Sequence, residues 1–521
     1  MRRFLLFAVI GAACGGDSST TDGGTDATTT DSPAPDSPVT TPAGDSVLER
    51  NHHPTRDAQY TQPLFTAGAL STLKRDSSFD GTIAGHSYAQ VLYVDNVALG
   101  KGTVNWVIAV TENNQVSALD ATTGAVVWQK TIGPNAASTG AGCGNVQPIG
   151  ITGTPVIDVT TRTMFLSAAI GTQANGSGTI KTHEIHALSI DDGSERPNFP
   201  VDAKTATYQN LTFNPPVENQ RGALAFVNNT LYVPYGGHWG DCGSYHGWVL
   251  GIPYPAGGPI KAFATSVPSG TRAAGIWAPG GIASDGTNLF VATGNTFGSN
   301  SWVGQEAIIR LQPGPSYSNQ TVDYFVPHDW LDMDNGDVDI GGSGPVLVKN
   351  LVASLGKNGM VYLLDSANLG GIGTTTQNDG AFNAPIASGE IINAAATVTT
   401  SAGNTWLIAH GYSGANGIGC KKGSGDIIAM KITTNPPGAT VEWCASSQSP
   451  GSPMITTSSD SGADAIVWFA GNHLNGWDIE TGTQVYTGSD SISNIQRFTT
   501  PIAARGHVYI AGDDKVYAFH L

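Results

Sequence analysis

One short pattern recurs along this chain at intervals of about fifty residues, and it constrains the fold more than any other feature. Its clearest copy is NNQVSALDATTGAVVWQK, where alternating apolar residues predict a strand, Asp120 to Gly124 predict a tight turn, and Trp128 lies in the next strand. Seven degenerate copies follow: EIHALSIDDGSE, GWVLGIPYPAGG, AIIRLQPGP, MVYLLDSANLGG, DIIAMKITTNPPGATVEW, LNGWDIETGTQVY and KVYAFHL.

Each copy follows a pair of strand-like segments of the type PVIDVTTRTMFLSAA or NTLYVPYGG. Four-stranded units repeated in this way cannot bury their faces alone, so they pack radially as blades. The chain has 67 Gly, 29 Pro and only 12% charged residues, which does not suit long helices. The sequence therefore predicts an all-β fold, an eight-bladed β-propeller of four-stranded antiparallel blades, with seven blades as the alternative.

The final copy, KVYAFHL, lacks one strand of a complete blade. We expect a strand from the N-terminal side, within residues 59–67, to complete that blade and close the ring. We also expect Trp128 and the other repeat tryptophans to pack between blades.

The first fourteen residues have the pattern of an export signal. Arg2 and Arg3 precede the apolar run FLLFAVI, which is too short to span a bilayer, and small residues precede Cys14. The segment resembles the lipobox of bacterial lipoproteins. That resemblance implies lipidation of Cys14 and, because Gly15 follows, anchoring at the outer membrane, on its periplasmic side or at the cell surface; simple secretion is the alternative.

A tether is predicted between this signal and the globular body. Residues 15–50 are rich in Thr, Ser, Asp, Gly and Pro and nearly devoid of apolar side chains, so we expect them to be disordered. The propeller is expected over residues 51–521. Membrane contact is expected only through the lipid anchor.

Four further cysteines suit an oxidising compartment. They allow three pairings, and nearness in sequence favours Cys420–Cys444, followed by Cys143–Cys242. The segment at residues 411–425 is then expected to be an exposed loop held by a disulfide. No CxxCH motif is present, so we expect no haem. The net charge of −17 with only 24 Lys and Arg argues against a nucleic-acid partner.

Residues 275–334 hold side chains that suit a metal-assisted site with a flat wall. Trp277 offers an indole face, Asn295 a carboxamide, and Asp332 and Asp334 a pair of carboxylates. Close carboxylates repel one another unless a cation lies between them, so their clustering would imply a bound ion.

The sequence ALDATTGAVVW resembles the pyrroloquinoline quinone (PQQ) propeller repeat, and residues 59–521 resemble the quinoprotein alcohol dehydrogenases. In that family a tryptophan lies under the quinone, an asparagine of a TGN motif binds the metal, and an aspartate of a PHD motif is the general base. The resemblance implies these roles for Trp277, Asn295 in ATGN, and Asp332 in VPHDWLDMD. It places Asp334 where lanthanide-using and some calcium-using members have a further metal ligand.

Two more positions extend this resemblance. GKNGMVYLLD is similar to the strand whose basic residue contacts the quinone oxygens, which implies that role for Lys357. The segment GHWGDCGSYHGW resembles the one that supplies a glutamate ligand to the metal, with Asp241 as a shorter replacement. The chain departs from the family in having no two adjacent cysteines.

Three functions remain open at this point. The first is a lipid-anchored dehydrogenase that oxidises an alcohol, sugar or polyol with PQQ and calcium or a lanthanide, and passes electrons to a separate acceptor. The second is a non-catalytic scaffold that binds proteins or glycans, as some carriers of this repeat do. The third is a propeller that binds metal without a quinone.

Overall fold

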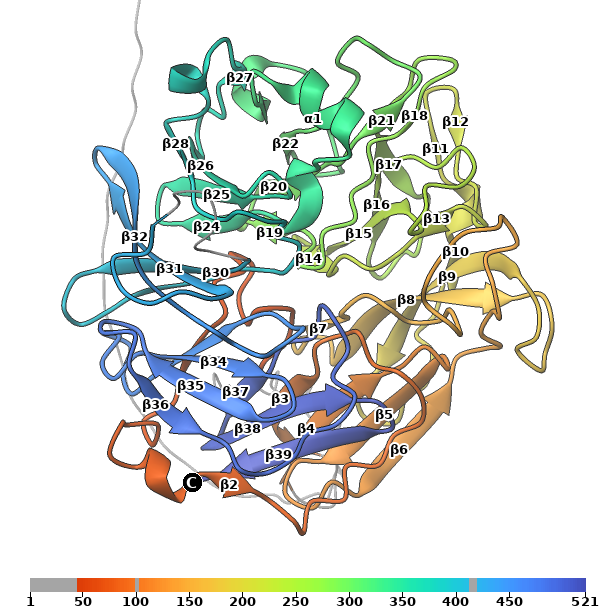
Figure 1. The fold of residues 1–521 in the computed structure, drawn as a ribbon. Coiled ribbons are helices and arrows are strands. Elements are labelled where there is room, and N and C mark those ends of the chain that lie inside the picture. The colour runs from red at the N-terminus through yellow and green to blue at the C-terminus, as the bar shows by residue number, and fades with distance from the viewer. Residues whose placement is uncertain (1–44, 99–102, 412–418) are drawn as a thin grey trace, which may run out of the picture. The chain divides into compact units, whose positions relative to one another are not determined.

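The strands of this protein form eight blades around a common axis (Figure 1). A computed structural model describes residues 45–98, 103–411 and 419–521. Within these residues there are ten sheets, of which two are small two-stranded sheets and the other eight are the blades. The all-β, eight-bladed prediction is thus confirmed, and the seven-bladed alternative is wrong.

The first four blades follow one another along the chain. Blade 1 comprises β3 (Leu92–Ala98), β4 (Thr103–Val110), β5 (Gln115–Asp120) and β6 (Val126–Thr131). Blade 2 comprises β7 (Val156–Asp158), β8 (Thr163–Gly171), β9 (Ile180–Ser189) and β10 (Val201–Asp202). Blade 3 comprises β13 (Glu218–Asn219), β14 (Ala225–Val227), β15 (Thr230–Gly237), β16 (Trp248–Pro253) and β17 (Lys261–Ala264). Blade 4 comprises β19 (Ala283–Ser284), β20 (Leu289–Ala292), β22 (Ile308–Leu311), β23 (Tyr324–Val326) and β27 (Gly371–Ile372).

The remaining blades complete the ring. Blade 5 comprises β24 (Val346–Val348), β25 (Leu351–Leu355), β26 (Met360–Asp365) and β28 (Phe382–Pro385). Blade 6 comprises β29 (Ala396–Thr399), β30 (Thr405–His410), β31 (Ile427–Thr434) and β32 (Pro437–Ala445). Blade 7 comprises β33 (Met454–Thr457), β34 (Ile466–Ala470), β35 (Leu474–Asp478) and β36 (Gln484–Thr487), and blade 8 begins with β37 (Ile502–Ala504), β38 (His507–Gly512) and β39 (Lys515–His520).

Two small sheets and several short helical elements lie in the connections between the blade strands. The two-stranded sheets pair β11 (Thr207–Tyr208) with β12 (Leu211–Thr212) and β18 (Arg272–Ala273) with β21 (Thr296–Phe297). The helical elements are α1 (Trp330–Gly336), η1 (Leu70–Thr72), η2 (Ala203–Thr205), η3 (Thr321–Asp323), η4 (Ile340–Gly342) and η5 (Thr376–Asn378). Among the described residues, no helix has the length and apolar character needed to cross a membrane.

The repeat folds as its sequence predicts. The Asp120 carboxylate accepts hydrogen bonds from the backbone N–H groups of Thr122 and Thr123, and its carbonyl accepts one from Gly124. Gly124 has a φ of +71°, and a Cβ at this position would lie 2.3 Å from the nitrogen of Gly81. The glycine of the repeat is therefore required both by the left-handed turn and by a neighbouring chain segment.

The repeat tryptophans link neighbouring blades, as predicted. The Trp128 indole donates to the carbonyl of Ile190 in the next blade, at 2.9 Å, and Trp443 donates to Ile479 at 2.8 Å. In each case the indole lies against a glycine in the next repeat's turn, where a Cβ would approach the ring to within 3 Å. Each contact joins one blade's outer strand to the following turn.

Blade 8 is closed by β2 (Lys74–Arg75), which pairs antiparallel with β39. The prediction of closure by the N-terminal side is confirmed, but the predicted segment, residues 59–67, is wrong. Within that segment β1 (Gln59–Thr61) instead pairs in parallel with the inner strand β33 of blade 7.

Residues 47–61, which we call the axial segment, contact the inner strands of most blades. Val47 pairs with Tyr93 of blade 1, and the buried Arg56 side chain donates to the carbonyls of Leu224 and Ile282 at 2.8 Å. Further backbone bonds join the segment to blades 2, 5, 6 and 7 through these pairs: Leu48–Ile157, Thr55–Leu347, Asp57–Thr397 and Ala58–Ile455. The globular body thus includes Val47 to Arg50, which lie within the stretch predicted as tether.

Both predicted disulfides are present. Cys143 pairs with Cys242 and Cys420 with Cys444, with Cα–Cα distances of 5.7 and 5.8 Å. The signal segment, Cys14, the tether up to residue 44, and residues 412–418 of the predicted 411–425 loop lie outside the described residues.

Candidate functional site

A cavity of about 550 Å³ opens where inter-strand segments of several blades converge. Its walls come from the loops that follow the second strands β15, β20 and β25, and from segments that lead into first strands of blades. In an antiparallel blade, the end of the second strand and the start of the first lie at the same edge, so these segments share one face of the ring. The residues used below that line it are Asn145, Arg221, His238, Trp239, Asp241, Tyr245, Trp277, Asn295, Asp337, Asp339, Lys357, Glu390 and Arg497.

Trp277 forms a half-buried wall of this cavity, between two cations. The Arg221 guanidinium lies 5.0 Å and the Lys357 ammonium 5.6 Å from its ring centroid, both within cation–π range. Burial lowers the pKa of Arg221 to about 10, so the side chain stays charged at neutral pH. Two positive charges therefore lie close to the ring of Trp277.

Asn295 reaches the cavity from the turn after β20. The preceding Gly294 lies against other site residues, because a Cβ there would be 2.7 Å from Asp339 Oδ1 and 2.9 Å from Trp277 Nε1. The backbone of Asn295 donates to Asp339 Oδ1 at 2.7 Å, whereas its carboxamide has no hydrogen-bond partner among the described residues. The glycine of the ATGN motif thus permits close contact, and the asparagine presents a free polar group to the cavity.

Asp339 is the buried carboxylate of the site. Its Oδ2 lies 2.7 Å from the Lys357 ammonium, which also pairs with Asp337 at 2.9 Å. Burial raises the pKa of Asp339, and the Lys357 charge opposes that rise only in part. Conversely, burial lowers the pKa of Lys357, but the charges and hydrogen bonds of Asp339 and Asp337 together outweigh it and the net shift is upward. The carboxyl group of Asp339 and the ammonium of Lys357 are thus in direct contact next to the indole of Trp277.

A second buried carboxyl group, Glu306, lies behind this pair. Its Oε2 accepts the N–H of Ile340 at 2.8 Å, and its Oε1 has no partner among the described residues. Burial and the nearby Asp339 charge both raise the pKa of Glu306. Burial therefore favours the protonated form of Glu306.

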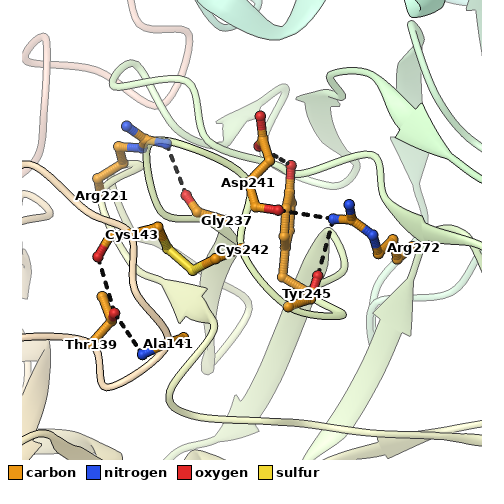
Figure 2. The surroundings of a disulfide bond; sticks show 10 residues. Thr139, Ala141, Cys143, Arg221, Gly237, Asp241, Cys242, Tyr245 and Arg272 are labelled. Carbon is orange, nitrogen blue, oxygen red and sulfur yellow. Dashed lines mark hydrogen bonds between the residues drawn. A yellow bond between two sulfur atoms is a disulfide. The ribbon is translucent and has the colours of Figure 1, made fainter.

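Asp241 stands at the cavity rim beside the Cys143–Cys242 disulfide (Figure 2). Its carboxylate accepts a hydrogen bond of 2.6 Å from the Tyr245 hydroxyl, and its carbonyl accepts one from Arg272. One carboxylate oxygen of Asp241 therefore remains available to a ligand.

The structure brings together Trp277, Asn295, Lys357 and Asp241, but it does not bring Asp332 or Asp334 to the cavity wall. Asp332 is exposed in the first turn of α1. Asp334 is buried and accepts hydrogen bonds from the N–H and hydroxyl of Thr296. Its carboxylate fastens α1 to the strand that follows Asn295.

Sequence reasoning missed Asp339 and Arg221. The chain contains two Asp-x-Asp pairs, at 332–334 and 337–339, and the family motif directed attention to the first. The second pair is the one that meets Lys357. Arg221 carries no local motif and enters the site only through the convergence of blade 3 with blade 4.

The side chains at the cavity wall suit one of the two groups that the family resemblance implies better than the other. A flat anionic quinone fits: Trp277 offers the wall, and the buried Nε of Arg221 has no partner among the described residues. A metal fits less completely, because Lys357 already pairs with Asp339 and, of the predicted metal ligands, only Asp241 and Asn295 offer side-chain oxygens at the cavity wall. A hard cation, which takes 6–8 oxygen ligands, would need several from the bound ligand or water.

A separate cluster of potential metal ligands lies near α1. In the part of the chain that the structure describes, His328, Asp329 and Asp379 form the one group of at least three such residues, with ligand atoms within 4.8 Å of each other. The His328 ring is already bonded to the buried Asp379 at 2.6 Å. This contact ties the start of α1 to the loop after β27.

The sequence matches no family model and no curated protein. Among solved structures, the chain resembles a quinohemoprotein alcohol dehydrogenase from Pseudomonas putida, at 12% identity with a TM-score of 0.57 over 92% of this chain and 80% of that one. It also resembles a europium-containing methanol dehydrogenase, at 15% identity and a TM-score of 0.58, over 90% and 89% of the two chains. It resembles a quinohemoprotein alcohol dehydrogenase from Comamonas testosteroni as well, at 13% identity and a TM-score of 0.58, over 92% of this chain and 81% of that one. At these identities the likeness concerns the fold alone: the chain has a β-propeller fold similar to that of these three proteins.

Proposed function

We propose that the cavity binds a flat, anionic quinone of the PQQ type and that the protein oxidises an alcohol, sugar or polyol. The observation that carries this proposal is the Asp339–Lys357 pair at 2.7 Å, placed beside the Trp277 ring and the free carboxamide of Asn295. When bound, the quinone would supply the hydride acceptor.

The chain's own residues would perform the remaining tasks. Asp339 would remove the proton from the substrate hydroxyl, which requires its ionised form, and the Lys357 ammonium favours that form. Trp277 would fix the plane of the ligand, and the Arg221 charge would neutralise a carboxylate on it. Asp241 and Asn295 would supply oxygen ligands if calcium or a lanthanide enters with the quinone.

The base assignment can be tested with the purified full chain. PQQ with calcium or a lanthanide should raise its melting temperature, and a dye should be reduced with an alcohol and sugar panel. Asp339→Asn should lower turnover by a factor of about 10²–10⁴, the usual worth of a general base, while the PQQ-induced shift remains. Asp460→Asn, which changes an exposed carboxylate in the β33–β34 turn, is the matched control.

Other results would redirect the proposal. If Asp332→Asn abolished turnover and Asp339→Asn did not, the base would be the residue that the family motif indicated. A metal-induced shift without quinone uptake would indicate the metal-binding propeller. No shift with either ligand would leave the protein- or glycan-binding scaffold.

We further propose that the protein is exported and anchored by lipid at Cys14. The support is the signal-like segment at residues 1–14 and the presence of two disulfides, which persist in oxidising compartments. Metabolic labelling with a fatty acid should label the wild-type chain and not Cys14→Ala.

A further inference from the structure

Trp239 is an unusual residue for its position. It lies at the cavity wall, in the loop between β15 and β16, and its side chain is 66% exposed. It has the greatest exposed fraction of the large apolar side chains in the described residues. A large indole left in water beside a polar cavity is typical of a ligand contact, because folding gains little from it.

The loop that carries Trp239 is held in place by several bonds. The Trp239 carbonyl accepts a hydrogen bond from the N–H of Gly144 at 2.9 Å. The Cys143–Cys242 disulfide, shown in Figure 2, joins the same two segments. Arg272 donates to the carbonyls of Asp241 and Gly243 at 2.9 and 3.0 Å. An indole fixed in this way loses little conformational freedom when a ligand binds.

The groups around Trp239 suit a ligand rich in hydroxyl groups. Asn145, Glu390 and Arg497 line the same cavity with exposed side chains, and Asp241 has a free carboxylate oxygen. Together they offer both donors and acceptors. A simple alcohol would use one such group, whereas a pyranose presents several hydroxyls at its edge and a C–H face that packs on the electron-rich face of an indole.

We propose that Trp239 is a platform for the ring face of a saccharide or cyclic polyol, whose hydroxyls bind the polar groups at the cavity rim. This proposal rests on the proposed function, since it names the substrate class of the same cavity. The saccharide ring lies on Trp239 at the mouth, and the quinone lies on Trp277 in the wall. The loop after β15 thereby selects sugars over small aliphatic alcohols.

Binding can be measured without any turnover. The full chain, without quinone or dye, is titrated with glucose, maltose and cellobiose by calorimetry and by saturation-transfer NMR, and with butanol for comparison. We expect sugar binding with ring C–H protons in contact with the protein. Trp239→Ala should weaken it at least tenfold, and Trp239→Phe, which keeps a flat face, should weaken it less. Leu64→Ala, at an exposed apolar residue outside the cavity wall, should have no effect.

The result separates this proposal from the proposed function. Equal sugar affinities in wild-type and Trp239→Ala protein, or no sugar binding by the wild type, would overturn the platform even if PQQ binds and butanol is oxidised. Loss of the PQQ-induced thermal shift in Trp239→Ala with sugar binding intact would assign Trp239 to the quinone instead. Sugar binding that depends on Trp239 in a chain that takes up no PQQ would support the platform and reject the dehydrogenase.

Discussion

At the scale of single residues, the site depends on charges held away from water. The Lys357 ammonium, 2.7 Å from Asp339, opposes the rise that burial causes in the pKa of this carboxyl group, while burial and the Asp339 charge raise the pKa of Glu306 behind it. One ammonium thus favours the ionised form of one carboxyl group, while burial favours the protonated form of the next.

The Asp339–Lys357 pair predicts a pH dependence of turnover. Since the pKa of Asp339 is raised, the rate should increase with pH in a range above that of an ordinary aspartate. Lys357→Met removes the charge that holds this pKa down, so the rise in kcat/KM should shift to higher pH. Lys181→Met, at an exposed lysine of β9, should leave the profile unchanged. An unshifted profile in Lys357→Met would contradict the role given to the pair.

Glu112 predicts a pH dependence of stability. It is fully buried, accepts the N–H of Gly150 at 2.6 Å, and burial raises its pKa from 4.5 to about 7. Between these two pKa values the folded state retains a proton that the unfolded chain releases. The contribution of Glu112 to the free energy of unfolding is therefore complete below pH 4.5 and is lost as the pH rises through about 7. It is on the order of 3 kcal/mol.

Denaturant unfolding at a series of pH values would measure this effect. The free energy of unfolding of the wild type should fall over that pH range, and Glu112→Gln should fall less steeply. Parallel curves for the two proteins would show that Glu112 does not titrate as described.

At the scale of elements, a tryptophan of the repeat joins blade 1 to blade 2, and another joins blade 6 to blade 7. The Trp443 indole is buried and bonded to Ile479, whereas Trp128 makes the equivalent bond to Ile190 while half-exposed. In these two copies a single tryptophan therefore supplies both inter-blade packing and a partner for a carbonyl in the following turn.

Removing one of these indole–carbonyl hydrogen bonds should lower the free energy of unfolding more where water cannot replace the indole as donor. Trp443→Phe leaves the Ile479 carbonyl unpaired in a buried position, and we expect a loss of about 1–3 kcal/mol in the free energy of unfolding. Trp128→Phe removes the same bond at a half-exposed position and should cost less. Equal losses by chemical denaturation would show that the hydrogen bond contributes little.

The sequence predicts elements well where they repeat and poorly where they do not. The alternating pattern and the Asp-to-Gly turn recur in many copies, so the blade count and strand order could be read from them. The closing strand β2 has two residues and no periodicity, and its partner β39 lies more than 400 residues away, so local pattern could not locate it.

In the candidate site, too, the sequence predicts the residues that belong to local motifs and misses those that depend on tertiary structure. Trp277, Asn295 and Lys357 follow local motifs, and the structure places them in one cavity. Which aspartate reaches the cavity, Asp332 or Asp339, depends on the orientation of α1. Asp332 lies exposed on this helix, whereas Asp339 follows it and contacts Lys357. That geometry arises from tertiary contacts of α1, such as the bond between Asp334 and Thr296, which no sequence window contains.

At the scale of the whole molecule, the axial segment and the blades depend on each other. Arg56 is fully buried, pairs with Glu49 at 2.9 Å, and donates to carbonyls of Arg50, Leu224 and Ile282. One side chain therefore joins the axial segment to blades 3 and 4. Its charge is compatible with burial only because each of these partners is in place.

Arg56→Ala should consequently destabilise the entire ring. Removing the cation leaves Glu49 and two blade carbonyls without their partner, and breaking a buried pair typically costs about 3–5 kcal/mol. Arg75→Ala, at the edge strand β2, is the matched control and should cost far less. Thermal and denaturant unfolding would compare the two, and similar losses would contradict the central role of Arg56.

The axial segment also sets the number of repeats. In an open stack of repeats, a unit can be added or lost because each one touches only its neighbours. Here the axial segment precedes all the blades in the sequence, yet it contacts residues as far apart as Tyr93 and Ile455. Inserting or deleting a blade would shift every later partner around the axis, so the copy number of this ring is fixed by a peptide that is not itself a repeat.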